Sequence, residues 1–281
     1  MTGPVVVGFD GSPESLAATE WAAREARRRA CPLDLLQAWP WPHRDVVGSE
    51  ETYRNAMDRL ARRAEELRAL AGDGPVTSAI VPTDPAEALH AAANSASLLV
   101  LGSRGLGAVR GFLVGSVSQE VLRRAGCPVV LVRAEPVESE GPVLVGLDLA
   151  HPTDDVLAFA FDAASRRRTP LRVVHVWSPP VTNEYMALQA TGGLKGELSV
   201  VERTLFAERL DPWRERHPEV PVTADLVQGS PSAALVDAAS EARLLVVGRR
   251  IRRTLLGVHL GPVAHAAIHH VRCPVALVPH A

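Results

Sequence analysis

Short apolar runs alternate with longer amphipathic stretches along the chain, and this alternation predicts a repeating strand–helix order. The runs at residues 4–9 and 98–101 are rich in valine and leucine, as expected of strands buried on both faces of a sheet. Ser12 and Pro13 open an amphipathic stretch that continues to about Arg29, which predicts a helix with Ser12 as its N-cap. The other predicted strands are 33–39, 76–81 and 129–133, and the other predicted helices are 50–70, a helix capped by Asp84, and 116–124.

The second half of the chain repeats this order, which predicts two domains. The segment Val-Gly-Phe-Asp ending at Asp10 returns as Val-Gly-Leu-Asp ending at Asp148, 138 residues later. The segment Cys-Pro-Val that starts at Cys127 returns at Cys273, 146 residues later, so the second copy has gained eight residues, which we place within 181–197. A repeat this long indicates tandem domains rather than a solenoid. We expect domains at 1–134 and 142–281, joined by a linker at 135–141.

Strands that are separated by helices run parallel with right-handed crossovers, so their helices cover both faces of the sheet. The sequence therefore predicts an α/β fold with two tandem parallel sheets. Its length of 281 residues fits about two domains, and 47% hydrophobic with 22% charged residues is typical of a globular protein.

Charge and cysteine content narrow the partners and the location. A net charge of −2 gives no overall field that would attract nucleic acid or an anionic membrane, and no apolar run is long enough to span a bilayer. A predicted strand begins almost at the first residue, which leaves no room for a signal peptide. Two of the three cysteines, Cys127 and Cys273, occupy equivalent places in different copies, which does not suit a disulfide. We expect a reducing cytoplasm.

A glycine-spaced loop in the first half is the main candidate site. Gly102, Gly105, Gly115 and Ser116 form the pattern G-x2-G-x9-G-S between a buried strand and a helix. A helix N-terminus offers unpaired N–H groups and a partial positive charge, and glycines let the backbone approach phosphate oxygens closely. With the Ser116 hydroxyl as a donor at the cap, the loop predicts a di- or triphosphate cradle. The alternative is a glycine-rich surface turn with a capping serine.

Asp10 is the second candidate. It follows the first strand at the carboxyl edge of the sheet, where ligands bind in doubly wound folds. Its carboxylate could accept hydrogen bonds from ribose hydroxyls. The alternative is that Asp10 or Ser12 caps the following helix, and the two roles can coexist.

Taken together, these motifs resemble the universal stress protein family. The carriers are Val-Val-Val-Gly-Phe-Asp-Gly-Ser at 5–12, the glycine loop, and Cys-Pro-Val-Val-Leu-Val at 127–132, and the order of elements covers nearly the whole chain twice. The resemblance implies a five-stranded parallel sheet in each domain, of the adenine-nucleotide alpha-hydrolase-like, Rossmann-like kind. It also implies that the domains pair through their last strands.

In the ATP-binding branch of that family, the resemblance implies a nucleotide at the loop. Asp10 would meet the ribose, and the backbone at Ala38 would meet adenine. Ribose and phosphates would be held by Gly102, Gly105, Gly115 and Ser116, helped by the N–H of Val117, with Gly8 from the first motif completing the expected set. Mg²⁺ would bridge the phosphates, because it needs few protein ligands beside phosphate oxygens.

The second copy departs from the pattern. The middle glycine is replaced by Ile251 and the serine by Pro262, which has neither N–H nor hydroxyl. We therefore expect one tightly bound nucleotide per chain, in the first domain. The arginines at 249, 250, 252 and 253 could bind an anion through their side chains, although a solvated basic loop is the favoured interpretation.

Two other groups are interpreted structurally. His265 and His269 lie four residues apart and could share a helix face with a metal, but no third ligand lies at a suggestive spacing, so a polar helix face is favoured. Cys127 and Cys273 each precede a proline and are interpreted as buried small hydrophobes rather than reactive thiols.

Three classes of function compete. The expected function is an ATP-binding stress-response or signalling module without catalytic residues. A ligand-free interaction scaffold and a weak ATP hydrolase are the alternatives, and a homodimer of tandem chains stays open. A nicotinamide-dependent dehydrogenase or an ATP pyrophosphatase is disfavoured, because the first strand is not followed by G-x-G-x-x-G and no Ser-Gly-Gly-x-Asp-Ser segment occurs. No lysine lies near the intact loop, which excludes a P-loop.

Overall fold

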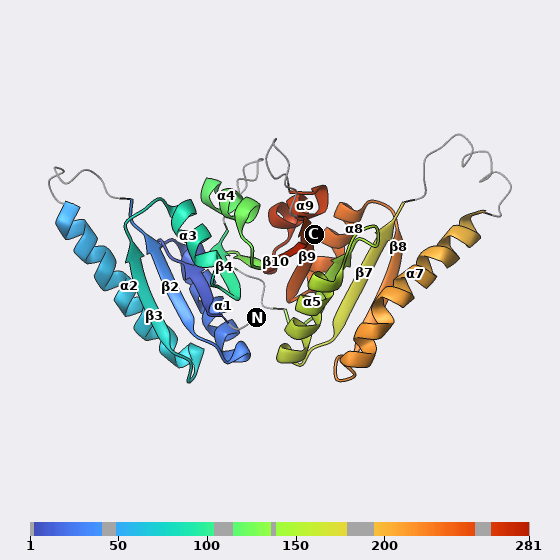
Figure 1. Cartoon of the computed structure of the whole chain (residues 1–281), viewed down its shortest axis with the longest axis horizontal. Helices are drawn as coiled ribbons and strands as arrows, with labels where there is room; N and C mark the ends of the chain where they lie inside the picture. The colour runs from blue at the N-terminus through green and yellow to red at the C-terminus, as the bar shows by residue number, and fades with distance from the viewer. Residues whose placement is uncertain are drawn as a thin grey trace.

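The computed structural model of the chain describes residues 3–40, 49–103, 115–135, 139–178, 194–250 and 260–280. Within this part of the chain, ten strands form one continuous sheet in the order β3-β2-β1-β4-β5-β10-β9-β6-β7-β8. Figure 1 shows the two halves side by side, with α2 and α7 at the outer ends and α4 and α9 near the middle.

The first half contains five parallel strands, as predicted. Each predicted element is confirmed, and its ends agree to within one residue. The elements are β1 (Val5–Gly8), α1 (Pro13–Arg29), β2 (Leu33–Ala38), α2 (Ser49–Ala71), β3 (Val76–Val81), α3 (Pro85–Ala93), β4 (Leu98–Gly102), α4 (Ser116–Arg124) and β5 (Val129–Val132). The caps are also confirmed, since Ser12 accepts from the N–H of Ser15 and Asp84 accepts from the N–H of Ala86.

The second half repeats the same parallel arrangement. Its elements are β6 (Val143–Leu147), α5 (Asp154–Arg167), β7 (Leu171–Trp177), α7 (Leu194–Arg216), β8 (Val222–Gln228), α8 (Pro231–Ala238), the 3₁₀ turn η1 (Ala239–Glu241), β9 (Leu244–Arg250), α9 (Pro262–His270) and β10 (Val275–His280). The order of strands from the centre outward is the same in both halves, which confirms the tandem α/β fold. The exact limits of the two domains and of the linker stay a prediction.

The two halves join through their last strands, as the resemblance implies. β5 and β10 pair antiparallel, and Val130 lies opposite Ala276. These two residues are counterparts in the repeat, so the approximate two-fold axis passes between them. The pairing matters because an unpaired edge strand would leave a row of backbone N–H and C=O groups without partners.

Two apolar cores lie on opposite faces of the sheet. Val5 and Val7 of β1 contribute to one core and Val6 to the other, as the alternation of a strand requires. The first core includes residues of α1, α2, α5 and α7, and the second includes residues of α3, α4, α8 and α9. The prediction of helices on both faces is therefore confirmed, and each core contains residues of both halves.

Two buried arginines cross the interface between the halves. Arg133 donates to the carbonyls of Ile268 at 2.6 Å and Val271 at 3.3 Å, at the end of α9. Arg249, only 2% exposed, donates to the carbonyl of Ala125 at the end of α4. Each cation thus satisfies free carbonyls at the C-terminus of a helix in the other half. The expectation that Arg249 belongs to a solvated basic loop is therefore wrong, because its side chain is buried between α4 and β9.

A buried carboxylate forms a second contact between the halves. Glu25 of α1 is fully buried; it accepts from Arg29 Nε at 2.7 Å and from Arg167 Nη2 of α5 at 2.5 Å. Burial alone would raise the pKa of Glu25, but the positive charges of Arg167 and Arg29 outweigh burial and hold the pKa below 4.5.

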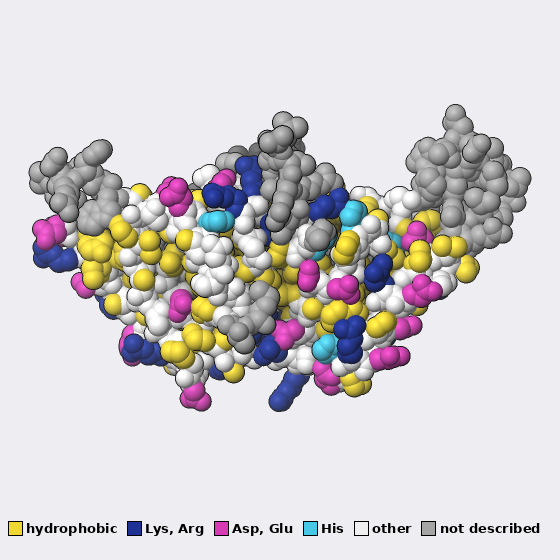
Figure 2. Space-filling model, in the orientation of Figure 1, with side chains coloured by type: hydrophobic (Ala, Val, Ile, Leu, Met, Phe, Trp, Pro, Cys, Tyr) yellow, Lys and Arg dark blue, Asp and Glu magenta, His cyan; other side chains and the backbone are white. Residues whose placement is uncertain are grey.

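The surface carries charges of both signs. On the face drawn in Figure 2, acidic and basic side chains are interspersed over both halves. Of the helices that the structure describes, none combines the length and the apolar character needed to cross a membrane.

Replacing Glu25 with glutamine should destabilise the chain strongly. Glu25→Gln leaves the buried arginines without their carboxylate, so we expect the free energy of unfolding in urea to fall by about 3–5 kcal/mol. The matched control is Glu65→Gln, which removes an exposed ion pair with Arg68 and should cost at most about 1 kcal/mol. Because the folded pKa of Glu25 lies below its unfolded value of 4.5, the difference between parent and variant should shrink as the pH falls below 4.5. Equal losses in the two variants would contradict a special role for Glu25.

Candidate functional site

The predicted site residues of the first half gather at the carboxyl edge of the sheet. Gly8 ends β1 and Asp10 follows it, Ala38 ends β2, and Gly102 ends β4. Strands β2, β1 and β4 are direct neighbours, so these four residues lie along one edge. This is the edge where ligands bind in doubly wound folds.

Gly115, Ser116 and Val117 open α4 at the same edge. Gly115 is the N-cap, with its carbonyl accepting from the N–H of Gln119 at 3.1 Å, and no side chain caps the helix. Ser116 is therefore the first residue of the helix rather than its cap, which corrects the expectation for its hydroxyl. Gly105 lies outside the described residues. The start of α4 combines N–H groups without a side-chain cap with the positive end of the helix dipole.

Asp10 supports the start of α1. One of its carboxylate oxygens accepts from the N–H of Ser12 at 2.9 Å and from the Ser12 hydroxyl at 2.6 Å. Ser12 Oγ in turn accepts from the N–H of Ser15 at 3.2 Å. Asp10 itself is exposed. The capping role that the sequence left open is therefore present, and the ribose contact stays a prediction.

The backbone of Ala38 is directed away from β3. On one side, the carbonyl of Leu36 accepts from the N–H of Phe9, next to β1; on the other, the N–H of Trp39 donates to Val81 of β3. Since successive residues of a strand present their polar backbone atoms to alternate sides, those of Ala38 face the side of β1, past the last residue of that strand. They therefore lie at the carboxyl edge of the sheet, where ligands bind in doubly wound folds.

The glycines of this edge have different reasons for being glycine. A Cβ on Gly102 would lie 2.7 Å from the carbonyl carbon of Glu14, so α1 itself excludes a side chain. A Cβ on Gly8 would lie 3.1 Å from Leu101 and 3.2 Å from Leu89. Gly115 differs, because a Cβ there would meet no atom of the described chain within 4 Å. Packing thus explains Gly8 and Gly102, whereas no described atom explains Gly115.

The counterparts of these residues in the second half enclose a cavity of about 550 Å³. This volume is in the range of small-molecule sites. Every described counterpart of a predicted site residue lines the cavity: Gly146, Asp148, Val176, Gly248, Gly261, Pro262 and Val263. Ile251, the counterpart of Gly105, lies outside the described residues. The repeat thus indicates that the chosen positions surround a binding volume.

The polar groups that line this 550 Å³ cavity differ from those at the equivalent edge of the first half. Asp148 Oδ2 lies 2.9 Å from Nδ1 of His151, and Nε2 of His151 is hydrogen-bonded to the guanidinium of Arg250. Asp148 thus contacts His151, which contacts Arg250, whereas Asp10 accepts hydrogen bonds from Ser12. No local pattern indicates these contacts, because Arg250 and His151 are far apart in sequence.

His280 is a further residue that sequence reasoning missed. Its imidazole covers Gly248, where an added Cβ would lie only 2.8 Å from Nε2. In the first half, the start of α1 fills the equivalent space over Gly102. The second half differs because α5 begins at Asp154, three residues later than α1 by the repeat alignment. The contact depends on the register of β10, which brings His280 opposite Arg250. The sequence alone does not indicate this register.

The histidines of α9 and the two equivalent cysteines behave as structural residues. The rings of His265 and His269 are 4.2 Å apart, but the described residues contain no group of three side chains suited to a metal. Burial, and after it the neighbouring His265, lowers the pKa of His269 to about 4. Cys127 and Cys273 are buried free thiols, and burial raises the pKa of Cys127 to about 11 and that of Cys273 to about 12. The thiolate forms are therefore scarce near neutral pH.

Known proteins that resemble this chain share one family. The model of the Universal stress protein family matches residues 1–133 and 141–279. Universal stress protein Rv2005c of Mycobacterium tuberculosis is 37% identical over 286 aligned residues, covering 96% of this chain and 95% of the relative. Universal stress protein Rv2623 of the same organism is 35% identical and covers 96% of this chain and 94% of the relative.

Solved structures agree on the fold. A universal stress protein from Archaeoglobus fulgidus superposes with a TM-score of 0.74 at 21% identity, covering 99% of this chain and 98% of that chain. At this identity the likeness supports the tandem α/β architecture alone.

The lowered pKa of His269 should make the fold sensitive to acid. The unfolded chain binds a proton at about pH 6.5 that the folded chain does not bind until about pH 4, so stability should fall as the pH drops between these values. In His269→Gln, the free energy of unfolding should depend less steeply on pH over this window. His270→Gln, which changes an exposed histidine of the same helix, should keep the slope of the parent. Urea titrations at several pH values measure both slopes, and an unchanged slope in His269→Gln would refute the assignment.

Proposed function

The chain belongs to the universal stress protein family, and from this premise we propose that it is an ATP-binding stress-response module whose intact nucleotide site lies in the first half. The observation that carries the proposal is the start of α4. Its N-terminus has no side-chain cap, a Cβ added at Gly115 would meet no described atom within 4 Å, and Asp10 and Ala38 lie along the same edge of the sheet. A helix start of this kind suits phosphate oxygens.

The parts of a nucleotide match the groups along this edge. Adenine, which has a planar donor and acceptor edge, suits the backbone of Ala38, and the ribose hydroxyls suit the carboxylate of Asp10. The phosphates suit the N–H groups and the hydroxyl at the start of α4, near Ser116 and Val117. Mg²⁺ would bridge the phosphates and keep most of its other ligands as water.

The second half has fewer hydrogen-bond donors at the equivalent place. Pro262 stands at the first position of α9, where it offers neither N–H nor hydroxyl, and His280 covers Gly248. A hydrogen bond to a charged group contributes about 1.5–3 kcal/mol, so the loss of two such bonds weakens binding by a hundredfold or more. We therefore propose one tightly bound nucleotide per chain.

The proposed role is binding and signalling rather than turnover. Asp10 is the one carboxylate of the proposed site, and it is engaged by Ser12. We also propose a cytoplasmic location, which the three free thiols support. A ligand-free scaffold and a weak ATP hydrolase remain the competing functions, and the experiments below separate them.

Gly115→Val tests the site. An added Cβ meets no described atom within 4 Å, and the φ of −53° at Gly115 is open to any residue, so the fold should be kept. Because the side chain would occupy the approach to the phosphates, we expect at least a tenfold loss of MgATP affinity in calorimetric titration of the full chain. Gly261→Val makes the same change in the second half and should leave the affinity unchanged. If a folded Gly115→Val protein binds MgATP like the parent, the site has been misassigned.

Nucleotide released on denaturation tests the stoichiometry. Purified full-length protein saturated with MgATP and then desalted should release about one nucleotide per chain, since the proposal assigns a complete phosphate site to the first half alone. Release of two per chain would refute the asymmetry, and release of none together with absent calorimetric binding would favour the scaffold. Phosphate release from ATP at a rate that Gly115→Val abolishes would favour the hydrolase.

A further inference from the structure

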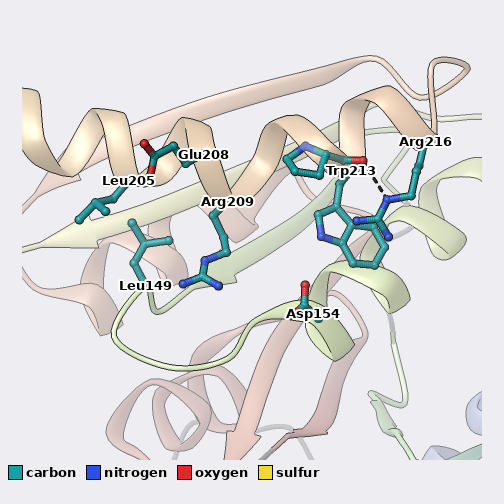
Figure 3. Close-up of a pocket in the computed structure, with 8 residues that line it drawn as sticks. Leu149, Asp154, Leu205, Glu208, Arg209, Trp213 and Arg216 are labelled. Carbon is teal, nitrogen blue, oxygen red and sulfur yellow. Dashed lines mark hydrogen bonds between the residues drawn. The ribbon is translucent and has the colours of Figure 1, made fainter.

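Another cavity, of about 270 Å³, lies between α7 and the start of α5. It is separate from the 550 Å³ cavity at the carboxyl edge of the sheet. Figure 3 shows Leu205 and Arg209 of α7 above Leu149 and Asp154, with Trp213 beside them. The two halves of the chain have the same fold, so the first half shows what this groove looks like when the protein fills it.

In the first half, two arginines fill the equivalent groove between α1 and α2. The guanidinium of Arg59 lies over Gly11, within 3.1 Å of where a Cβ would be. Arg63 joins the two helices: its Nε donates to Thr19 Oγ1 at 2.9 Å, and its Nη2 donates to Glu20 Oε1 at 3.0 Å. Arg63 also donates to the carbonyl of Leu16 and to the carboxylate of Glu66.

The second half has an arginine at the position of Arg63 but lacks the side chains with which Arg63 forms hydrogen bonds. α5 follows α1 by 138 residues and α7 follows α2 by 146, so Arg63 corresponds to Arg209 and Arg59 to Leu205. The partners Thr19, Glu20 and Glu66 correspond to Leu157, Ala158 and Pro212, none of which can accept a hydrogen bond through its side chain. Within the part of the chain that the structure describes, Arg209 forms no hydrogen bond and no ion pair.

The cavity is open to solvent and presents two opposite charges beside an apolar wall; both belong to exposed residues that form no ion pair with each other. Arg209 and Asp154 point into the same space in Figure 3, but no ion pair joins them. The other arginine of the cavity is engaged, since Arg216 donates to the carbonyl of Pro212 at 2.9 Å and lies 4.3 Å from the ring centre of Trp213. The apolar wall comes from Leu149, Leu205 and Trp213.

Pro212 interrupts the hydrogen bonding of α7. It lies inside the helix and has no N–H, so it cannot donate to the carbonyl of Glu208, four residues earlier. The acceptor for a ligand's ammonium group is the carboxylate of Asp154, which lines the cavity.

We propose that this cavity binds a free amino acid with an apolar side chain of about the size of leucine. The carboxylate would pair with the guanidinium of Arg209 in two parallel hydrogen bonds, and the ammonium would be held by Asp154. The side chain would pack between Leu149, Leu205 and the edge of Trp213. A simple anion would leave Asp154 without a partner, and a simple cation would leave Arg209 without one. The proposal does not depend on nucleotide binding.

Titration of the full chain with L-leucine and two truncated analogues tests the class of ligand. L-Leucine should bind with a dissociation constant of about 1 mM or tighter, measured by calorimetry or by ligand-observed NMR. 4-Methylpentanoate lacks the ammonium and 3-methylbutylamine lacks the carboxylate, and each should bind at least tenfold more weakly. Absence of leucine binding at about 10 mM would overturn the proposal. Equal binding of 4-methylpentanoate and leucine would overturn the zwitterion in favour of a plain anion site.

Variants that rebuild the first-half groove locate the site. Leu205→Arg restores the counterpart of Arg59, and Pro212→Glu restores the counterpart of Glu66 beside Arg209. Both should reduce leucine affinity at least tenfold without lowering the urea midpoint, because Leu205 is exposed and proline is unfavourable inside a helix. Arg209→Gln should have the same effect on affinity. Arg63→Gln, the matched change in the first half, should leave leucine affinity unchanged. Leucine binding that survives in both Leu205→Arg and Arg209→Gln would overturn the assignment.

Discussion

The antiparallel pairing of β5 with β10 is the interaction on which the rest of the structure depends. Val130 pairs with Ala276, its own counterpart in the repeat, and this turns two five-stranded units into one sheet. Without the pairing, each unit would end in an apolar strand with unpaired backbone groups. Because the sheet is continuous, the apolar cores on its two faces include residues of both halves. Helices from the two halves then meet next to the axis, where no solvent can satisfy their polar groups.

Buried charged side chains provide hydrogen-bond partners where the helices of the two halves meet. Arg133 and Arg249 come from non-equivalent positions of the repeat, yet each donates to the carbonyls that end a helix of the other half. On the other face, Glu25 sits between Arg29 and Arg167, which are counterparts, so one carboxylate serves two related arginines. Breaking such an arrangement is costly, since a charge is left buried without a partner. These contacts therefore specify how the halves meet as well as holding them together.

The two halves differ in their side chains and in one helix start, while the order of their strands is the same. Gly102 and Gly248 end equivalent strands, but the first is covered by the start of α1 and the second by His280. Arg63 and Arg209 occupy equivalent places on long helices, but only the first has partners on the neighbouring helix. In the first case α5 begins three residues later than its counterpart, and in the second the partner side chains differ; both changes lie at a cavity of the second half. Such changes alter what a cavity can bind at little cost to the fold, because the strands and their register are unchanged.

The sequence by itself determined the order and the ends of the elements, the repeat and the family. Those features are local: an apolar run, a cap such as Ser12 and a spaced set of glycines can each be recognised within a few residues. It also located the predicted site at one edge of the sheet, because the carboxyl ends of parallel strands must meet there. Only the tertiary structure decided that Arg249 is buried, that His280 covers Gly248 and that Arg209 has no partner among the described residues. Each of these features depends on contacts between side chains that are far apart in the sequence. A local sequence pattern does not contain that information.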